Sequence, residues 1–319
     1  MKAEELVKSL HATADQLLDD GASVGDLKIA VAALREMRAA FALFAPYRRI
    51  RKISCFGSAR TQVGDPIFCL AESFAKRIAD AGFMVITGAG PGIMEACQRG
   101  AGAERSFGVS ILLPFEQKAN VVIRDDTKLM DFKYFFTRKL FFIKEAHGIA
   151  LFPGGFGTHD EGFEVLTLLQ TGKCQPMPLV ALDRPGGTYW KSWDRYIRDH
   201  LLRRGMISNE DLALYKVFDS VEEGARELTA FYRVYHSSRF VRDLLVVRLN
   251  RQLPGTRLAE LAEEFRDIIT GGKITQCSAF PVERDEPEAF HLPRLAFRFD
   301  RTHYGRLRML IDALNRTED

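Results

Sequence analysis

The chain has 319 residues, of which 46% are hydrophobic and 27% charged, and its formal net charge is +3 at pH 7. Such a chain can bury one sizeable core together with a smaller satellite domain. Because positive and negative charges nearly balance, neither nucleic acid nor a membrane surface is expected as a partner. No run of about 18 apolar residues is present, which argues against a membrane span.

The five cysteines are scattered along the chain and include no C-x-x-C pair. They are expected to be reduced, small core residues rather than disulfide partners or zinc ligands. The first residues are polar and acidic, unlike a secretory signal. We therefore expect a cytoplasmic protein.

Residues 2–19 and about 24–45 carry apolar residues at helical spacing, and Pro46 ends the second stretch. They predict an N-terminal helical arm over residues 1–48. Such an arm is expected to serve packing or oligomer contacts rather than catalysis.

From residue 50, short apolar runs bounded by glycine or proline alternate with longer amphipathic stretches. Apolar strands without polar alternation are buried on both faces, which indicates a parallel sheet covered by helices. We predict an open α/β sheet over residues 49–235 with helices on both faces. The expected strands are Arg51–Phe56, Phe83–Thr87, Ser106–Leu113, Ile149–Phe152 and Pro178–Leu182, and the expected helices are about 66–81, 91–102, 131–146, 158–171 and 189–203.

The composition changes again after about residue 235. Strands are predicted at Leu244–Leu249 and Pro293–Phe299, with Gly272–Phe280 as a candidate third, and helices at Thr256–Thr270 and His303–Asn315. Residues 236–319 should therefore form a small α+β unit, ferredoxin-like or ACT-like by pattern alone.

Ligands of parallel α/β sheets bind at the carboxyl ends of the strands, which directs attention to the loops there. In the loop 87–96, Gly88, Gly90 and Gly92 stand between a strand and a helix. They let the backbone approach a ligand, and the helix start favours an anion such as phosphate. A dinucleotide fingerprint needs glycine or alanine where Ile93 stands, so NAD binding is disfavoured. A tight turn without a ligand is the alternative.

The loop 153–161 reads Pro-Gly-Gly-Phe-Gly-Thr-His-Asp-Glu. Its glycines, Gly154, Gly155 and Gly157, can wrap a phosphate with backbone N–H groups, and the Thr158 hydroxyl can add a hydrogen bond. Thr158-x-x-Glu161 is also the pattern of a capping box, in which Glu161 only satisfies a helix start. A cap does not require the preceding glycines, which favours a binding site.

Three further segments carry polar candidates. Arg138 and Lys139 are embedded among aromatic residues; Lys139 is expected to be solvated, whereas Arg138 is either solvated or held by an anion. Ser58 and Arg60 follow the first strand in a turn of small residues. The segment 113–120, after the third strand, is either part of the same crevice or an ordinary surface loop.

Taken together, these motifs resemble the LONELY GUY (LOG) family, often mislabelled as lysine decarboxylases, over about residues 50–232. The motifs that carry the resemblance are Gly57-Ser-Ala-Arg60, Thr87-Gly-Ala-Gly-Pro-Gly-Ile-Met-Glu-Ala96, Leu113-Pro-Phe-Glu-Gln117, Arg138-Lys139 and Pro153-Gly-Gly-Phe-Gly-Thr-His-Asp-Glu161. The resemblance implies a Rossmann-like fold and a phosphoribohydrolase that releases a free base and ribose 5-phosphate from a nucleoside 5'-monophosphate. It also implies a homo-oligomer, a dimer or larger.

By the same resemblance, Arg138 and Glu161 are the catalytic residues and Gly154, Gly155, Gly157 and Thr158 form the phosphate loop. The expected substrate-binding set is completed by Gly88, Gly90, Gly92, Ser58, Arg60 and Glu95. His159 stands where the family commonly has an aliphatic residue and is expected to alter helix packing more than chemistry. The regions before residue 50 and after 235 lie outside the resemblance and should add either regulation or oligomer contacts.

The expected chemistry places Glu161 beside the ribose carbon, where positive charge develops as the glycosidic bond breaks. No cofactor and no metal is required, and no His/Cys/carboxylate cluster at metal spacing is found. The alternative function is a carrier or sensor that binds a phosphorylated ligand without turnover. A decarboxylase would need pyridoxal phosphate on a lysine, and no glycine-flanked lysine is placed to bind it.

Overall fold

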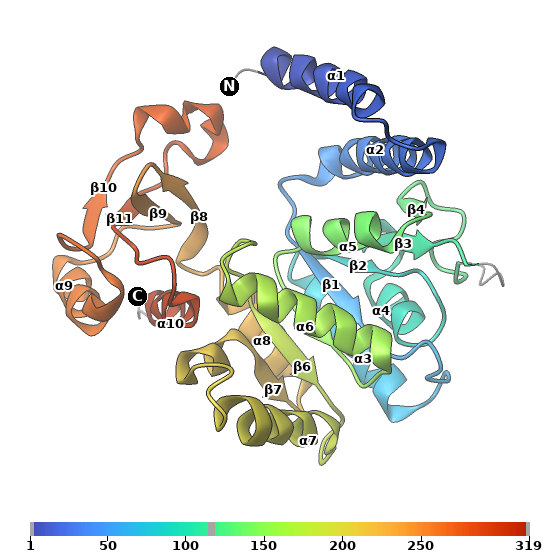
Figure 1. Cartoon of the computed structure of the whole chain (residues 1–319). Helices are drawn as coiled ribbons and strands as arrows, with labels where there is room; N and C mark the ends of the chain where they lie inside the picture. The colour runs from blue at the N-terminus through green and yellow to red at the C-terminus, as the bar shows by residue number, and fades with distance from the viewer. Residues whose placement is uncertain (1–2, 114–118, 317–319) are drawn as a thin grey trace.

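The computed structural model describes residues 3–113 and 119–316, and its central feature is a seven-stranded parallel sheet in the order β4-β3-β2-β1-β5-β6-β7 (Figure 1). Its strands are β1 (Lys52–Phe56), β2 (Met84–Thr87), β3 (Ser106–Ile111), β4 (Leu129–Phe132), β5 (Ile149–Leu151), β6 (Leu179–Leu182) and β7 (Lys216–Phe218). The chain runs outward from β1 to β4 and then returns to β5 on the other side of β1. This is the doubly wound, Rossmann-like arrangement that the sequence predicts.

Helices cover both faces of this sheet because successive strand residues point to opposite sides. In β1, Ile53 and Cys55 join a core with α3 (Pro66–Asp80), α4 (Ile93–Ala101) and α8 (Val221–Ala230). Phe56 joins the core of the other face, which is built from α2, α5 (Phe135–Lys144), α6 (Phe156–Gln170) and α7 (Tyr189–Tyr196).

The predicted N-terminal arm is a pair of helices, α1 (Ala3–Asp19) and α2 (Val24–Phe44). Ser23 and Asp26 form a capping box that starts α2. Helix α1 buries no residue, whereas Phe44 near the end of α2 stacks on Phe107 of β3, with ring centroids 4.5 Å apart. The arm is therefore attached to the sheet through the end of its second helix.

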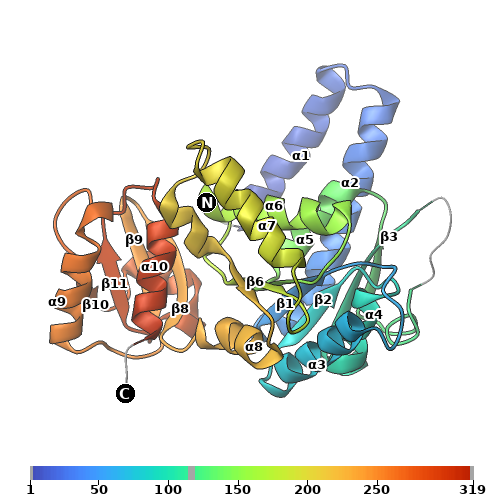
Figure 2. The same ribbon diagram turned by 90° about the horizontal axis from the view of Figure 1, so that it is seen from below.

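The C-terminal unit contains a four-stranded antiparallel sheet in the order β10-β11-β9-β8 (Figure 2). Its elements are β8 (Tyr235–Val241), β9 (Leu244–Leu249), α9 (Gly255–Glu264), β10 (Thr275–Cys277), β11 (Arg294–Phe297) and α10 (Tyr304–Asn315). The α+β character agrees with the sequence. The element order, strand-strand-helix repeated twice, is a cyclic shift of the ferredoxin-like order that the pattern suggested.

Three strands were not predicted from the sequence. These are β4, β7 and β8, and the first two form the edges of the parallel sheet. The expected helix at 131–146 begins only at Phe135, because residues 129–132 belong to β4. Over residues 3–113 and 119–316, no helix combines the length and apolar character needed to cross a bilayer.

A buried ion cluster stabilises the C-terminal unit. Glu283 is fully buried and accepts hydrogen bonds from Arg248 (Nε to Oε1, 2.9 Å) and from Arg294 (Nε to Oε2, 3.2 Å). Removing one partner of a buried ion pair leaves an uncompensated charge in a low-dielectric interior. The carboxylate of Glu283 is therefore essential to this packing.

We predict that Glu283→Gln lowers the free energy of unfolding by about 3 kcal/mol, because buried Arg294 loses its counter-charge and buried Arg248 keeps only Glu286. Urea denaturation of the full chain measures this change. Asp285→Asn, in the same segment but 59% exposed, is the matched control and should change stability by less than about 1 kcal/mol. Equal effects of the two substitutions would contradict the prediction.

Candidate functional site

The loops after β1, β2 and β5 meet at the carboxyl edge of the parallel sheet. Strand β1 pairs with β2 on one side and with β5 on the other. The Ser58 N–H donates to the Pro153 carbonyl (3.1 Å), and the Ser58 carbonyl accepts from the Ile93 N–H (3.0 Å). One residue thus joins all three loops, at the point where the strand order reverses and ligands of such sheets bind.

Close approach requires glycine at several positions in these loops, and Gly92 and Gly154 illustrate it. Gly92 has a φ of +69°, and a Cβ there would lie 2.3 Å from the Ser58 carbonyl oxygen. A Cβ on Gly154 would lie 2.1 Å from the Thr158 Oγ1. At Gly155 and Gly157 a Cβ would meet nothing within 4 Å, so the backbone there faces open space. The start of α6 is therefore accessible to a ligand.

The capping box that was the alternative interpretation of Thr158 and Glu161 does not form. Helix α6 has Gly155 as its N-cap, with no side-chain hydrogen bond to the first turn. The first N–H groups of the helix consequently have no side-chain partner, which favours an anion at this position. Glu161 lies more than one turn into the helix, and its side chain is free of any capping role.

Glu161 is a buried carboxyl group with an incomplete set of partners. It is 5% exposed, and its Oε2 atom has no hydrogen-bond partner among the described residues. The Lys139 Nζ lies 3.7 Å from that oxygen, close enough for an ion pair but not for a hydrogen bond. Burial raises the pKa of Glu161 to about 7, against the opposing charges of Lys139 and Arg138.

Lys139 is not solvated, contrary to the expectation from the sequence. Its side chain is 17% exposed, and Nζ lies 2.8 Å from Asp160 and 2.6 Å from Glu164, in addition to Glu161. The three carboxylates project from α6, and Lys139 connects them to α5. Its two short contacts are to Asp160 and Glu164, and its charge also lowers the pKa of Glu161, although by less than burial raises it.

Arg138 carries a guanidinium group without a carboxylate partner. The group lies over the Phe135 and Phe142 rings, 4.9 and 5.4 Å from their centroids. Its Nε is buried without a hydrogen bond among the described residues, and its Nη1 lies 3.8 Å from where a Cβ of Gly88 would stand. Burial lowers the pKa of Arg138. The arrangement leaves a positive charge beside a glycine loop.

Two supporting residues could not be identified as such from the sequence. Asn120 is buried and its Nδ2 donates to the carbonyls of Ala89 and Gly90 and to the Gln98 Oε1. Ala89 has a φ of +60°, which is rare for alanine, and the amide of Asn120 holds this turn. The sequence indicated the segment 113–120 as a candidate part of the site, and Asn120 belongs to that segment. Residues 114–118 of the same segment lie outside the described part of the chain.

The loop after β5 is fixed from the other side by Tyr189. The Tyr189 hydroxyl donates to the Gly154 carbonyl (2.5 Å), and the His159 Nε2 lies 2.7 Å from the same hydroxyl. The rings of His159 and Tyr189 are stacked, with centroids 5.8 Å apart. The histidine therefore supports the loop by packing and by a hydrogen bond.

Three of the residues predicted for the site have partners close to them in the sequence. Glu95 is bound by Arg99 in an i,i+4 ion pair of 2.6 Å along α4. Arg60 is exposed, and its backbone N–H donates a hydrogen bond to the Ser58 Oγ (3.1 Å) in a local turn. Substrate contacts for Glu95, Arg60 and the Ser58 hydroxyl remain predictions.

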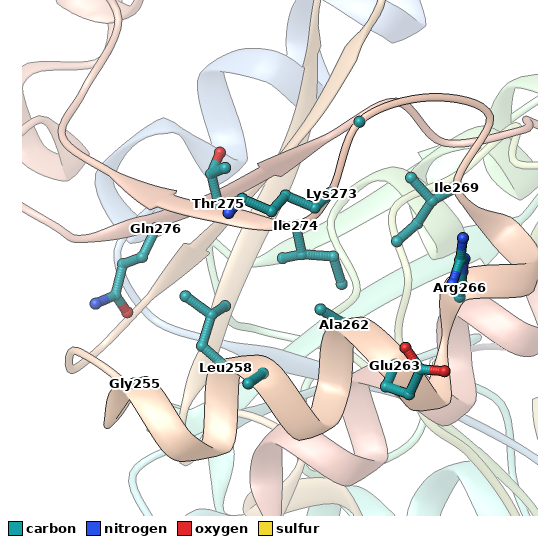
Figure 3. Close-up of a pocket in the computed structure, with 12 residues that line it drawn as sticks. Gly255, Leu258, Ala262, Glu263, Arg266, Ile269, Lys273, Ile274, Thr275 and Gln276 are labelled. Atoms are coloured by element: carbon teal, nitrogen blue, oxygen red, sulfur yellow. The ribbon is translucent and has the colours of Figure 1, made fainter.

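Two cavities lie away from these loops. One, of about 640 Å³, is in the C-terminal unit between α9 and β10, with Leu258 and Ile274 facing each other across it (Figure 3). The other, of about 1180 Å³, lies between the C-terminal unit and helices α5 and α6, and includes Glu164 in its lining. Neither is lined by Glu161 or Arg138.

Residues 94–228 match the family model described as possible lysine decarboxylase, which is the label attached to the LOG family. The predicted family resemblance is confirmed. The matched segment begins at Met94 in α4 and continues to Leu228 in α8. It therefore contains both the Arg138-Lys139 pair and the loop that ends at Glu161.

Among curated proteins, the chain is similar to a pyrimidine/purine nucleotide 5'-monophosphate nucleosidase of Escherichia coli strain K12. The two are 24% identical over 246 residues, which cover 71% of this chain and 52% of the relative. The same enzyme from Escherichia coli O157:H7 gives the same values. The chain spans about half the length of the curated relatives it matches.

Among solved structures, the chain is similar to the molybdenum cofactor carrier protein of Chlamydomonas reinhardtii, with a TM-score of 0.40 and 17% identity over 57% of this chain and 99% of the other. The molybdenum cofactor binding protein of Rippkaea orientalis gives a TM-score of 0.36 and 17% identity, over 54% of this chain and 90% of the other. These alignments are too loose to bear on function.

We predict that Gly92→Ala disrupts the site, because the added Cβ meets the Ser58 carbonyl that joins the loops. Gly82→Ala is the matched control: its φ is +87° and its surroundings are open, so it adds backbone strain without a clash. The control should lower the free energy of unfolding by about 1 kcal/mol. Gly92→Ala should lower it by more and should also weaken AMP binding at least tenfold. Calorimetric titration and urea denaturation of both variants measure these effects; equal losses would contradict the prediction.

Proposed function

We propose that the chain hydrolyses the N-glycosidic bond of a nucleoside 5'-monophosphate, giving a free base and ribose 5-phosphate. The observation that carries the proposal is the buried, incompletely paired carboxyl of Glu161, which lies on a helix with an uncapped glycine start and interacts electrostatically with Arg138. The family match and the activity named for the Escherichia coli relative support it. A cytoplasmic homo-oligomer is part of the same proposal.

In this mechanism the phosphate binds at the start of α6, where Gly155 and Gly157 leave the backbone accessible. Phosphate binding supplies remote energy that places the ribose against Glu161. As the bond from C1' to the base nitrogen breaks, the carboxylate stabilises the positive charge on the sugar and orients water. The hydroxyl of that water adds to C1', and its proton goes to the departing base.

Arg138 and Lys139 have different tasks in this scheme. Arg138, with no carboxylate within ion-pair distance among the described residues, is available to an anionic group of the nucleotide. Lys139 holds Asp160 and Glu164 and so fixes α6 against α5. Because burial outweighs the charges of Lys139 and Arg138, Glu161 keeps a raised pKa and is stabilised by a developing positive charge.

We predict that AMP, GMP, CMP, UMP or IMP releases ribose 5-phosphate when mixed with the protein, and that adenosine does not. Glu161→Gln should lower kcat at least about 100-fold while leaving AMP affinity within a few-fold. Asp160→Asn is the matched control, since Asp160 also contacts Lys139 but is 62% exposed, and should retain most activity. Tight nucleotide binding without base release in the wild type would instead establish the carrier or sensor alternative.

The ionisation of Glu161 gives a second prediction. The mechanism needs the carboxylate, so kcat/KM should rise with pH and level off above about 7. A neutral carboxylic acid acting as proton donor would give the opposite slope. In Glu164→Gln, Lys139 loses one partner and a like charge near Glu161 disappears, so the inflection should move to lower pH. If the inflection instead reported ionisation of the substrate phosphate, it would stay at the same pH in Glu164→Gln. The variant therefore distinguishes titration of Glu161 from titration of the substrate.

A further inference from the structure

The largest cavity described above lies between the C-terminal unit and the parallel-sheet domain, apart from the candidate site. Its walls come from the segment before β1, from α5 and α6, from the loop after α6, and from β8 and β9. Its volume of about 1180 Å³ exceeds the usual size of small-molecule sites, which is about 300–1,000 Å³. It can therefore hold a ligand larger than a nucleoside monophosphate.

The lining of this cavity is strongly cationic. Seven lysine and arginine side chains face three carboxylates across it. Three of the seven are already paired: Lys144 with Glu145, and Arg239 and Arg248 with the carboxylates of the segment 283–286. The other four, Arg48, Arg49, Arg51 and Lys173, have no carboxylate oxygen within 4.0 Å in the part of the chain that the structure describes. Unpaired cations around one cavity create a positive potential that attracts anions.

Arg51 is the innermost of these unpaired cations. Its guanidinium stacks on the Tyr232 ring, 4.0 Å from the centroid, and its Nε is buried without a hydrogen bond among the described residues. Its Nη2 donates to the His236 carbonyl at 3.5 Å, so the group is fixed in orientation while its Nε still lacks an acceptor. An anionic oxygen is the partner that a guanidinium pairs with most strongly.

Two histidines in the lining respond to the same potential. Burial, together with the charges of Lys52 and Arg51, lowers the pKa of His147 to about 3. Burial and the charges of Arg51 and Arg248 lower the pKa of His236 to about 4. Both rings are therefore neutral at pH 7 and offer hydrogen bonds without adding charge.

Aromatic rings line the cavity together with the cations. Phe136, Tyr232, Tyr235, Phe240 and Tyr304 all contribute to its lining. Flat rings of this kind stack on planar, π-bonded ligand groups. We propose that the cavity binds a small organic polyanion that carries two or more phosphates and an aromatic ring.

A ligand in this cavity would touch the ion network of the candidate site. Glu164 lines the cavity, and it also accepts a hydrogen bond from Lys139 (2.6 Å), which in turn lies beside Glu161. The binding itself does not require turnover at Glu161. Failure of the nucleosidase assay and failure of ligand binding are therefore separate results.

The test is calorimetric titration of the full chain with ATP, tripolyphosphate and adenosine. We expect ATP to bind most tightly, tripolyphosphate less tightly because it lacks the ring, and adenosine at least tenfold more weakly than ATP. Adenosine binding as tightly as ATP would overturn the proposal, because the cations would then contribute nothing.

Location is tested by two double variants with the same change in charge. Arg49→Glu with Lys173→Glu, both exposed at the cavity, should weaken ATP binding at least tenfold and leave AMP binding within twofold. Arg105→Glu with Arg204→Glu, also exposed but outside the cavity lining, should change ATP binding by less than twofold. Equal losses of ATP affinity in the two double variants would overturn the proposal, because ATP would then respond only to the overall charge of the protein. Loss of ATP binding in Gly92→Ala, with no loss in the cavity variant, would also overturn it, because ATP would then bind at the glycine loops.

Discussion

The backbone of Ser58 is the constraint on which the candidate site depends. Its N–H and carbonyl each bond to a different neighbouring loop, so the ends of β1, β2 and β5 are held at fixed distances. Glycine is required at 92 because any Cβ would occupy the position of the Ser58 carbonyl. The glycine loops therefore serve two purposes: Gly92 and Gly154 allow the loops to pack together, and Gly155 and Gly157 leave backbone open to a ligand.

At Glu161, desolvation outweighs the attraction of two nearby cations. Lys139 is 3.7 Å away but makes its short contacts to Asp160 and Glu164, and Arg138 has no ion pair with it. Each neighbouring carboxylate also repels a negative charge at Glu161. A carboxyl group left in this state is costly to ionise, and a developing positive charge next to it relieves that cost.

The sequence predicted the elements whose signal is local. The central strands are continuous apolar runs and were found within one or two residues, whereas β4 (Leu-Met-Asp-Phe) and β7 (Lys-Val-Phe) are short edges that carry no such run. The spacing of Thr158 and Glu161 could not by itself distinguish a capping box from a binding site, because it does not specify that α6 begins after Gly155. The contacts of Lys139 were missed because its carboxylates lie on another helix, more than twenty residues further along the chain.

The two proposed anion sites would hold their ligands in different ways, which explains why only one of them could be predicted from the sequence. At the start of α6, backbone N–H groups would bind the phosphate, and this requires closely spaced glycines that form a recognisable motif. In the interdomain cavity, side chains supply the charge, from residues as far apart as Arg48 and Arg248. Separate arginines have no characteristic spacing, so only the folded chain brings them together. Glu164 borders the second environment and bonds to Lys139 of the first, so a charge placed in the cavity acts on the same lysine that lies beside Glu161.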